Sequence, residues 1–76
     1  MSQYRVSFFK YLLSSDGHQF RSLQQSIVIR RAKNTDRAVE AAKRRYERRC
    51  HVDDWSLYAD GLELEVNGKT SAISLR

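Results

Sequence analysis

Hydrophobic and polar residues alternate along the first part of the chain as they do in a half-buried β-strand. Within Gln3–Leu13, Tyr4, Val6 and Phe8 occupy every second position, which predicts a strand with one apolar face. The alternation is lost around Phe9–Leu13. This loss indicates either a β-bulge or the end of the strand.

The following segments predict two further strands. Ser14–Gly17 is typical of a turn, because glycine supplies a positive φ angle and Asp16 can bond its own backbone. The second strand is clearest at Ser26–Arg31 and would form a hairpin with the first. Leu57–Val66 contains the third strand, in which leucine and valine alternate with glutamate.

The C-terminal residues leave two alternatives open. Asn67 and Gly68 form a strong hairpin signal, which predicts a fourth strand directly after them. That strand would begin with the polar run Lys69–Ser71, and chain ends commonly fray, which favours a ragged tail. Residues 67–76 are therefore expected to be a tail or a short fourth strand.

One segment, Thr35–Cys50, has clear helical periodicity. Thr35 is expected to cap its N-terminus, and Asp36 lies in the first turn, where the helix dipole favours an acidic residue. At 100° per residue, one stripe of the helix is apolar and is assigned to the core. It consists of Ala38, Val39, Ala42, Tyr46 and Cys50. An adjacent flank is basic, and it consists of Arg37, Arg44, Arg45 and Arg48.

Together these elements predict a single small α+β domain with ββαβ order over residues 1–66. Its mostly antiparallel, three-stranded sheet has the order 2-1-3, and the helix packs on one face. The predicted core consists of Tyr4, Val6, Phe8, Ile27, Ile29, Val39, Ala42, Tyr46, Leu62 and Leu64. Phe9 and Val28 are the apolar exceptions on the other face of the sheet, where a partner would contact them.

The length and charge of the chain refine this picture. With 76 residues, 41% of them hydrophobic, the chain forms one domain with a thin core. Its net charge of +5 is uneven. Residues 30–49 hold nine of the 14 lysines and arginines, whereas the last third of the chain is acidic. Such asymmetry indicates either a nucleic-acid surface or charges that neutralise one another within the fold.

Cysteine usage and hydropathy favour a cytoplasmic protein. The single cysteine, Cys50, cannot form an internal disulfide, which fits a reducing compartment. The first residues lack the apolar segment of a signal peptide, and no apolar run is long enough to span a membrane. The three glycines are isolated, so neither Gly-rich phosphate-binding fingerprint is present, and no cofactor is expected.

Potential metal ligands and nucleophiles are densest at the end of the helix. Cys50, His51, Asp53 and Asp54 could in principle bind a metal, but a structural zinc site requires four well-spaced cysteines or histidines. A helix C-terminus also disfavours the thiolate that catalysis by Cys50 would require. His18 is read as an exposed turn residue. We therefore expect neither a metal site nor an enzyme.

The basic flank is the strongest candidate for function. Its arginines, with three cations that precede the helix, could bind phosphates. The candidate site consists of Arg37, Arg44, Arg45, Arg48, Arg30, Arg31 and Lys33. The chain is thus expected to be a basic binding module, acting as a nucleic-acid accessory domain or contacting another acidic macromolecule. The alternative is a protein-interaction or homodimeric adaptor that uses an exposed sheet edge. Neither a membrane nor a small-molecule substrate is expected as a partner.

Overall fold

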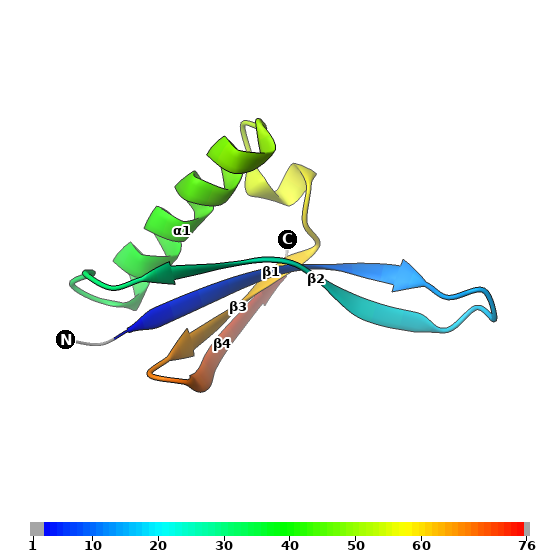
Figure 1. Cartoon of the computed structure of the whole chain (residues 1–76), viewed down its shortest axis with the longest axis horizontal. Coiled ribbons are helices and arrows are strands. Elements are labelled where there is room, and N and C mark those ends of the chain that lie inside the picture. The colour runs from blue at the N-terminus through cyan, green and yellow to red at the C-terminus, as the bar shows by residue number, and fades with distance from the viewer. Residues whose placement is uncertain (1–2, 76) are drawn as a thin grey trace.

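The computed structural model describes residues 3–75, except for the side chain of Leu75. In chain order it contains β1 (Tyr4–Leu13), β2 (Gln19–Ile29), α1 (Thr35–Cys50), the short 3-10 helix η1 (Trp55–Leu57), β3 (Gly61–Val66) and β4 (Lys69–Leu75). The strands form one antiparallel sheet of order β2-β1-β3-β4. Helix α1 covers one face of this sheet (Figure 1), which confirms the α+β class.

The structure contains the fourth strand rather than the ragged tail. A tight turn leads from β3 into β4, and its residues Asn67 and Gly68 both have positive φ, 52° and 87°. The hairpin signal of these two residues therefore outweighs the polarity of Lys69–Ser71. Residues 1 and 2 of the predicted domain, and residue 76 of the predicted tail or fourth strand, lie outside the described part of the chain.

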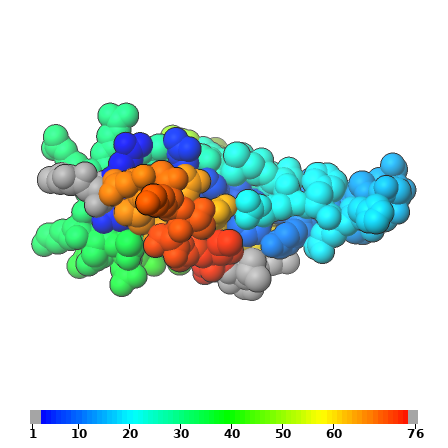
Figure 2. Space-filling view, turned by 90° about the horizontal axis from the view of Figure 1, so that it is seen from below, coloured from blue at the N-terminus to red at the C-terminus, as the bar shows by residue number. Residues whose placement is uncertain are grey.

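The loss of alternation in the first strand corresponds to a bulge, and the strand continues beyond it. Phe8 pairs with Gln25 whereas Phe9 pairs with Leu23, so Gln24 is the extra residue on β2. Beyond Phe9, β1 has no partner on its β3 side, because β3 begins at Gly61 opposite Phe9. The hairpin therefore extends past the rest of the sheet. We call this projection, residues 10–23, the arm (Figures 1 and 2).

Helix α1 has the predicted bounds but a different N-cap. Asn34, not Thr35, is in the extended conformation that precedes the helix, and its side-chain oxygen accepts from the Arg37 amide at 2.9 Å. Asparagine caps helices at least as well as threonine, and it stands one residue earlier. At the C-terminus His51 adopts the left-handed conformation, and its amide bonds back to the last turn.

The core lies between α1 and the covered face of the sheet. The residues assigned to the core are buried except Val39 and Cys50, which are partly buried, and the core also includes Trp55 and Ala59. At its centre the rings of Phe8 and Tyr46 stack with centroids 4.0 Å apart, and Trp55 meets Phe8 edge-on at 5.9 Å. These three rings join sheet, helix and η1.

Phe9 is buried although it points to the uncovered face of the sheet, so the expectation that it is exposed was wrong. Its exposed fraction is 2%. The opposite position on β3 is Gly61, which has no side chain, so the ring has space to lie against the sheet. Tyr11 packs edge-on against the ring, and the Arg21 guanidinium lies 4.9 Å from its centre. A long cationic side chain thus covers an aromatic ring.

Replacement of Phe8 should test the central stack. Phe8→Ala removes a fully buried ring and is expected to lower the free energy of unfolding by about 3–5 kcal/mol, as measured by urea denaturation followed by circular dichroism. Leu57→Ala is the control, because Leu57 is 71% exposed. An equal loss in both variants would contradict the assignment of the core.

Tyr46→Phe tests a different feature of the same stack. The Tyr46 hydroxyl is buried without a well-formed hydrogen bond in the described part of the chain. Burial, with the weakly polar Cys50 thiol beside it, raises the pKa of Tyr46 far above its usual value. Removing an unpartnered hydroxyl should leave stability unchanged or increase it by up to about 1 kcal/mol in the same denaturation experiment. A loss above about 1 kcal/mol would reveal a hydrogen bond to this hydroxyl.

Candidate nucleic-acid interface

Two adjoining grooves lie between the end of β2 and one side of α1. Their volumes are about 460 and 340 Å³, and both are lined by Ile29, Arg31 and Ala41. The larger also involves Val28, Arg30 and Arg45, and the smaller Ala32, Lys33 and Arg37. We call the two together the basic groove. Five of the seven predicted site residues therefore line one continuous surface: Arg30, Arg31, Lys33, Arg37 and Arg45.

The local structure explains why these cations meet. Arg37, Ala41 and Arg45 are spaced four residues apart, so they follow one another along a single side of α1. The small Ala41 between the two arginines leaves room for the groove floor. Strand β2 ends at Ile29, and the segment 30–34 turns back to start α1 beside it. This return brings the cations of the loop to the same side of the helix.

Arg44 and Arg48 do not line the groove. Both are exposed, and the helical repeat places them within about 20° of Arg37 on the same flank of α1, two and three turns further along the helix. They extend the positive surface along α1 beyond the groove. The predicted flank is thus divided into a groove wall, which includes Arg37 and Arg45, and an outer stripe of Arg44 and Arg48.

None of the seven predicted cations forms an ion pair with an acidic group of residues 3–75. The ion pairs in that range join His18 to Asp16, Arg21 to Glu63, and Lys43 to Glu40. Two of the acidic residues near the C-terminus, Glu63 and Asp54, have other partners. Glu63 also accepts a hydrogen bond from Thr70, and Asp54 caps η1. Hydrogen bonds from the amide and hydroxyl of Ser56 lower the pKa of Asp54. Within residues 3–75, therefore, no ion pair joins the basic flank to the acidic last third of the chain.

Arg45 has a structural contact in addition to its place in the groove. Its guanidinium donates to the backbone carbonyl of Val28 at 3.4 Å. Val28 belongs to β2, an edge strand of the sheet. The contact therefore occupies a backbone acceptor that an edge strand would otherwise leave open. At this length and exposure the bond is weak, so the positive charge of Arg45 remains accessible.

The groove contains cations and small apolar groups but no aromatic platform. Tyr46 and Trp55 are buried in the core, and neither lines the groove. Stacking of bases on aromatic side chains is thus not a feature of this surface. Its chemistry suits the charged backbone of a polyanion, contacted by guanidinium groups above a floor of Ile29, Ala32 and Ala41.

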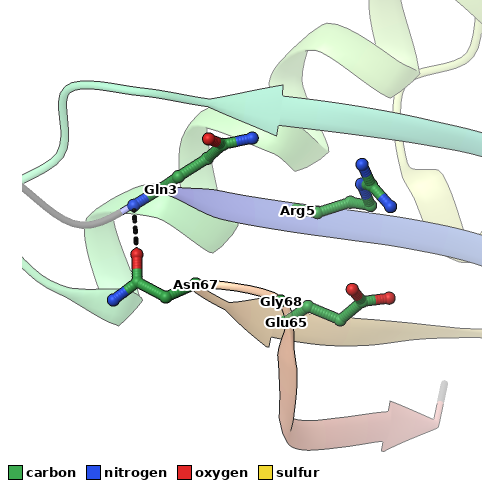
Figure 3. A pocket seen from close by; sticks show the side chains of 5 residues that line it. All are labelled: Gln3, Arg5, Glu65, Asn67 and Gly68. Carbon is green, nitrogen blue, oxygen red and sulfur yellow. Dashed lines mark hydrogen bonds between the residues drawn. The ribbon is translucent and has the colours of Figure 1, made fainter.

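A separate hollow lies on the uncovered face of the sheet (Figure 3). Its volume is about 340 Å³, and Arg5 and Glu65 line it from neighbouring strands. At its edge the Gln3 amide donates to the side-chain oxygen of Asn67 at 2.9 Å, and the Asn67 amide donates to the Gln3 carbonyl. Because its lining carries one cation and one anion, this hollow has no net preference for an anion. It is therefore a weaker candidate than the basic groove.

The end of α1 does not gather its potential metal ligands. Within residues 3–75, no group of three or more histidine, cysteine, aspartate or glutamate side chains is placed to hold a metal ion. Cys50 is a partly buried thiol packed against the core, and His51 is the helix C-cap. His18 is exposed in the arm turn, as expected. No helix in this range is long and apolar enough to cross a membrane.

Comparison with protein families, curated proteins and solved structures finds no match to this chain. The candidate site is therefore defined by its own geometry. The sequence identified its cations but not its apolar floor. Ala32 and Ala41 were unassigned because small residues at the margin of an apolar stripe resemble ordinary helix and loop residues. The four-residue spacing of Arg37, Ala41 and Arg45 was the signal that could have identified the groove wall.

Removal of the outer arginines should test whether their charge contributes to the stability of the fold. Arg44→Gln with Arg48→Gln deletes two exposed cations that have no ion-pair partner within residues 3–75, so the free energy of unfolding is expected to change by less than about 0.5 kcal/mol. Thermal unfolding followed by circular dichroism measures this change. A large loss of stability would show that the outer stripe contributes to the fold.

Proposed function

We propose that this protein is a small, non-enzymatic, cytoplasmic module that binds nucleic acid through its phosphate backbone. The observation that carries the proposal is the basic groove, where five cations without ion-pair partners in residues 3–75 converge on a small apolar floor. A cluster of unpaired cations on one surface attracts polyanions, and arginine forks fit phosphate oxygens.

The proposed contacts position a nucleic acid without reading its sequence. Phosphate contacts carry no base information directly. The groove presents guanidinium and ammonium groups around apolar residues, and neither a recognition helix nor a stacking platform is part of it. Affinity should therefore depend strongly on salt and weakly on base sequence. Such a module would act as an accessory that adds affinity to another specific component.

A protein-interaction or homodimeric adaptor is the second candidate function, and one observation favours it. The arm exposes five large apolar side chains: Tyr11, Leu12, Leu13, Phe20 and Leu23. Exposed apolar clusters on small proteins commonly mark contact surfaces. The two candidates use opposite ends of the molecule, so each can be tested without disturbing the other.

Salt-dependent binding to a 20-base-pair duplex should test the nucleic-acid function. If each of the five groove cations neutralises one phosphate, log K should fall with log[salt] with a slope of about −4.5. Arg31→Gln with Arg37→Gln should flatten that slope by about two units. Fluorescence anisotropy between about 50 and 200 mM salt measures both slopes.

The matched control removes the same charge elsewhere. Arg5→Gln with Lys69→Gln also lowers the net charge by two, but neither residue lines the basic groove. The control should retain a slope close to that of the wild type. If both double variants weaken binding equally, the attraction is generic and the groove is not the site. Absence of binding of the wild type to both DNA and RNA at about 50 mM salt would contradict the function itself.

A further inference from the structure

The arm is apolar on both of its faces. Tyr11, Leu13 and Leu23 lie on one face and Leu12 and Phe20 on the other, because alternate residues of paired strands share a face. Their exposed fractions range from 41% for Leu12 to 75% for Leu13. The arm projects beyond helix α1 and the other strands of the sheet (Figures 1 and 2). A two-stranded hairpin is at best marginally stable in water unless further strands or a packed surface support it.

The edges of this hairpin differ in how they are protected. At the base of the arm, the Asp60 carboxylate accepts from the Tyr11 amide at 2.7 Å and so occupies the β1 edge. Near the C-terminal end of β2, the Arg45 guanidinium donates a hydrogen bond to the Val28 carbonyl. Towards the tip of the arm, residues 19–23 of β2 have only one side-chain contact to their backbone among the described residues, a 3.4 Å bond from the Gln24 side-chain amide to the Ser22 carbonyl. This part of the edge is open for pairing.

The charge distribution indicates how a second copy of the chain could approach the open β2 edge of the arm. The chain carries a net charge of +5, so two copies repel each other. The charges of the arm are locally balanced, because Arg21 pairs with Glu63 and His18 lies near Asp16, while Lys10 packs over the Tyr58 ring. The basic groove lies at the opposite end of the molecule, whose longest extent is 44 Å (Figure 1). Two copies that meet arm to arm therefore keep their basic grooves farthest apart.

We propose that a second copy of this chain pairs with the arm, strand to strand along residues 19–23 of β2, and that the flanking apolar side chains of both copies pack together. With roughly 200 Å² for a large side chain, the exposed fractions correspond to about 500 Å² of apolar surface per arm. In this pairing Phe20 and Leu23 of each copy meet across the two β2 strands, whereas the apolar side chains of β1 lie one strand further out, so only part of this surface is buried and the dimer is expected to be weak. Pairing produces a four-stranded antiparallel unit, which satisfies the open edge and gives each two-stranded arm the further strands that it lacks.

Sedimentation equilibrium over a range of protein concentrations tests this pairing. The wild type should change from 8.9 kDa towards twice that mass as concentration rises. Phe20→Ser with Leu23→Ser removes one apolar side chain from each face of the arm and should weaken dimerisation at least tenfold. Leu57→Ser with Ile73→Ser is the matched control, because it removes two exposed apolar side chains outside the arm, and it should dimerise like the wild type.

Hydrogen exchange of the wild type gives an independent readout that requires no substitution. Amide protection within residues 19–23 should increase with protein concentration, whereas protection in β4, the other edge strand, should not. A wild type that remains at 8.9 kDa at about 1 mM overturns the proposal. So does equal weakening by the arm variant and its control, or concentration-dependent protection located in β4.

Discussion

The stack of Phe8 on Tyr46 is the contact on which the rest of the structure depends. Phe8 stands near the middle of β1, and Tyr46 is in the fourth turn of α1, so one aromatic pair fixes the height and rotation of the helix over the sheet. Trp55 completes the contact from η1. Because the apolar stripe of α1 must face these rings, its arginines are directed to the β2 side and to solvent. The positive surface is therefore a consequence of how the core packs.

The two ends of the molecule have opposite physical character. At one end, cations gather where β2 returns into α1, and acidic side chains elsewhere do not reach them within the described chain. At the other end, the arm carries apolar side chains whose charged neighbours are locally balanced. In a molecule with so thin a core, surface that does not stabilise the fold can be devoted to contacts with partners. If both proposals hold, a dimer would present two basic grooves on its outer ends and bind a long polyanion with increased avidity.

Much of this fold could be predicted from periodicity, because local pattern and tertiary packing agree. The bounds of α1, the order of the first three strands and almost all of the predicted core follow from the 3.6-residue and two-residue repeats. The arm could not be predicted, since alternation does not show where a neighbouring strand stops. The burial of Phe9 also escaped prediction, because it depends on Arg21 and Gly61, which are distant in sequence. For the candidate site, helical spacing identified the arginines of α1. Their proximity to Arg30, Arg31 and Lys33, however, depends on the path of the loop between β2 and α1, which the spacing does not predict.

The most direct test of the account is to map the surface that nucleic acid touches. Backbone amide chemical shifts of the ¹⁵N-labelled protein would be recorded by NMR during titration with a short duplex at low salt. The largest changes should occur around the basic groove, at residues 30–37 and near Ala41 and Arg45, and the hollow at Arg5 and Glu65 should be unaffected. Changes centred on the uncovered sheet face or on the arm, or spread evenly over all exposed cations, would contradict the proposed binding at the groove.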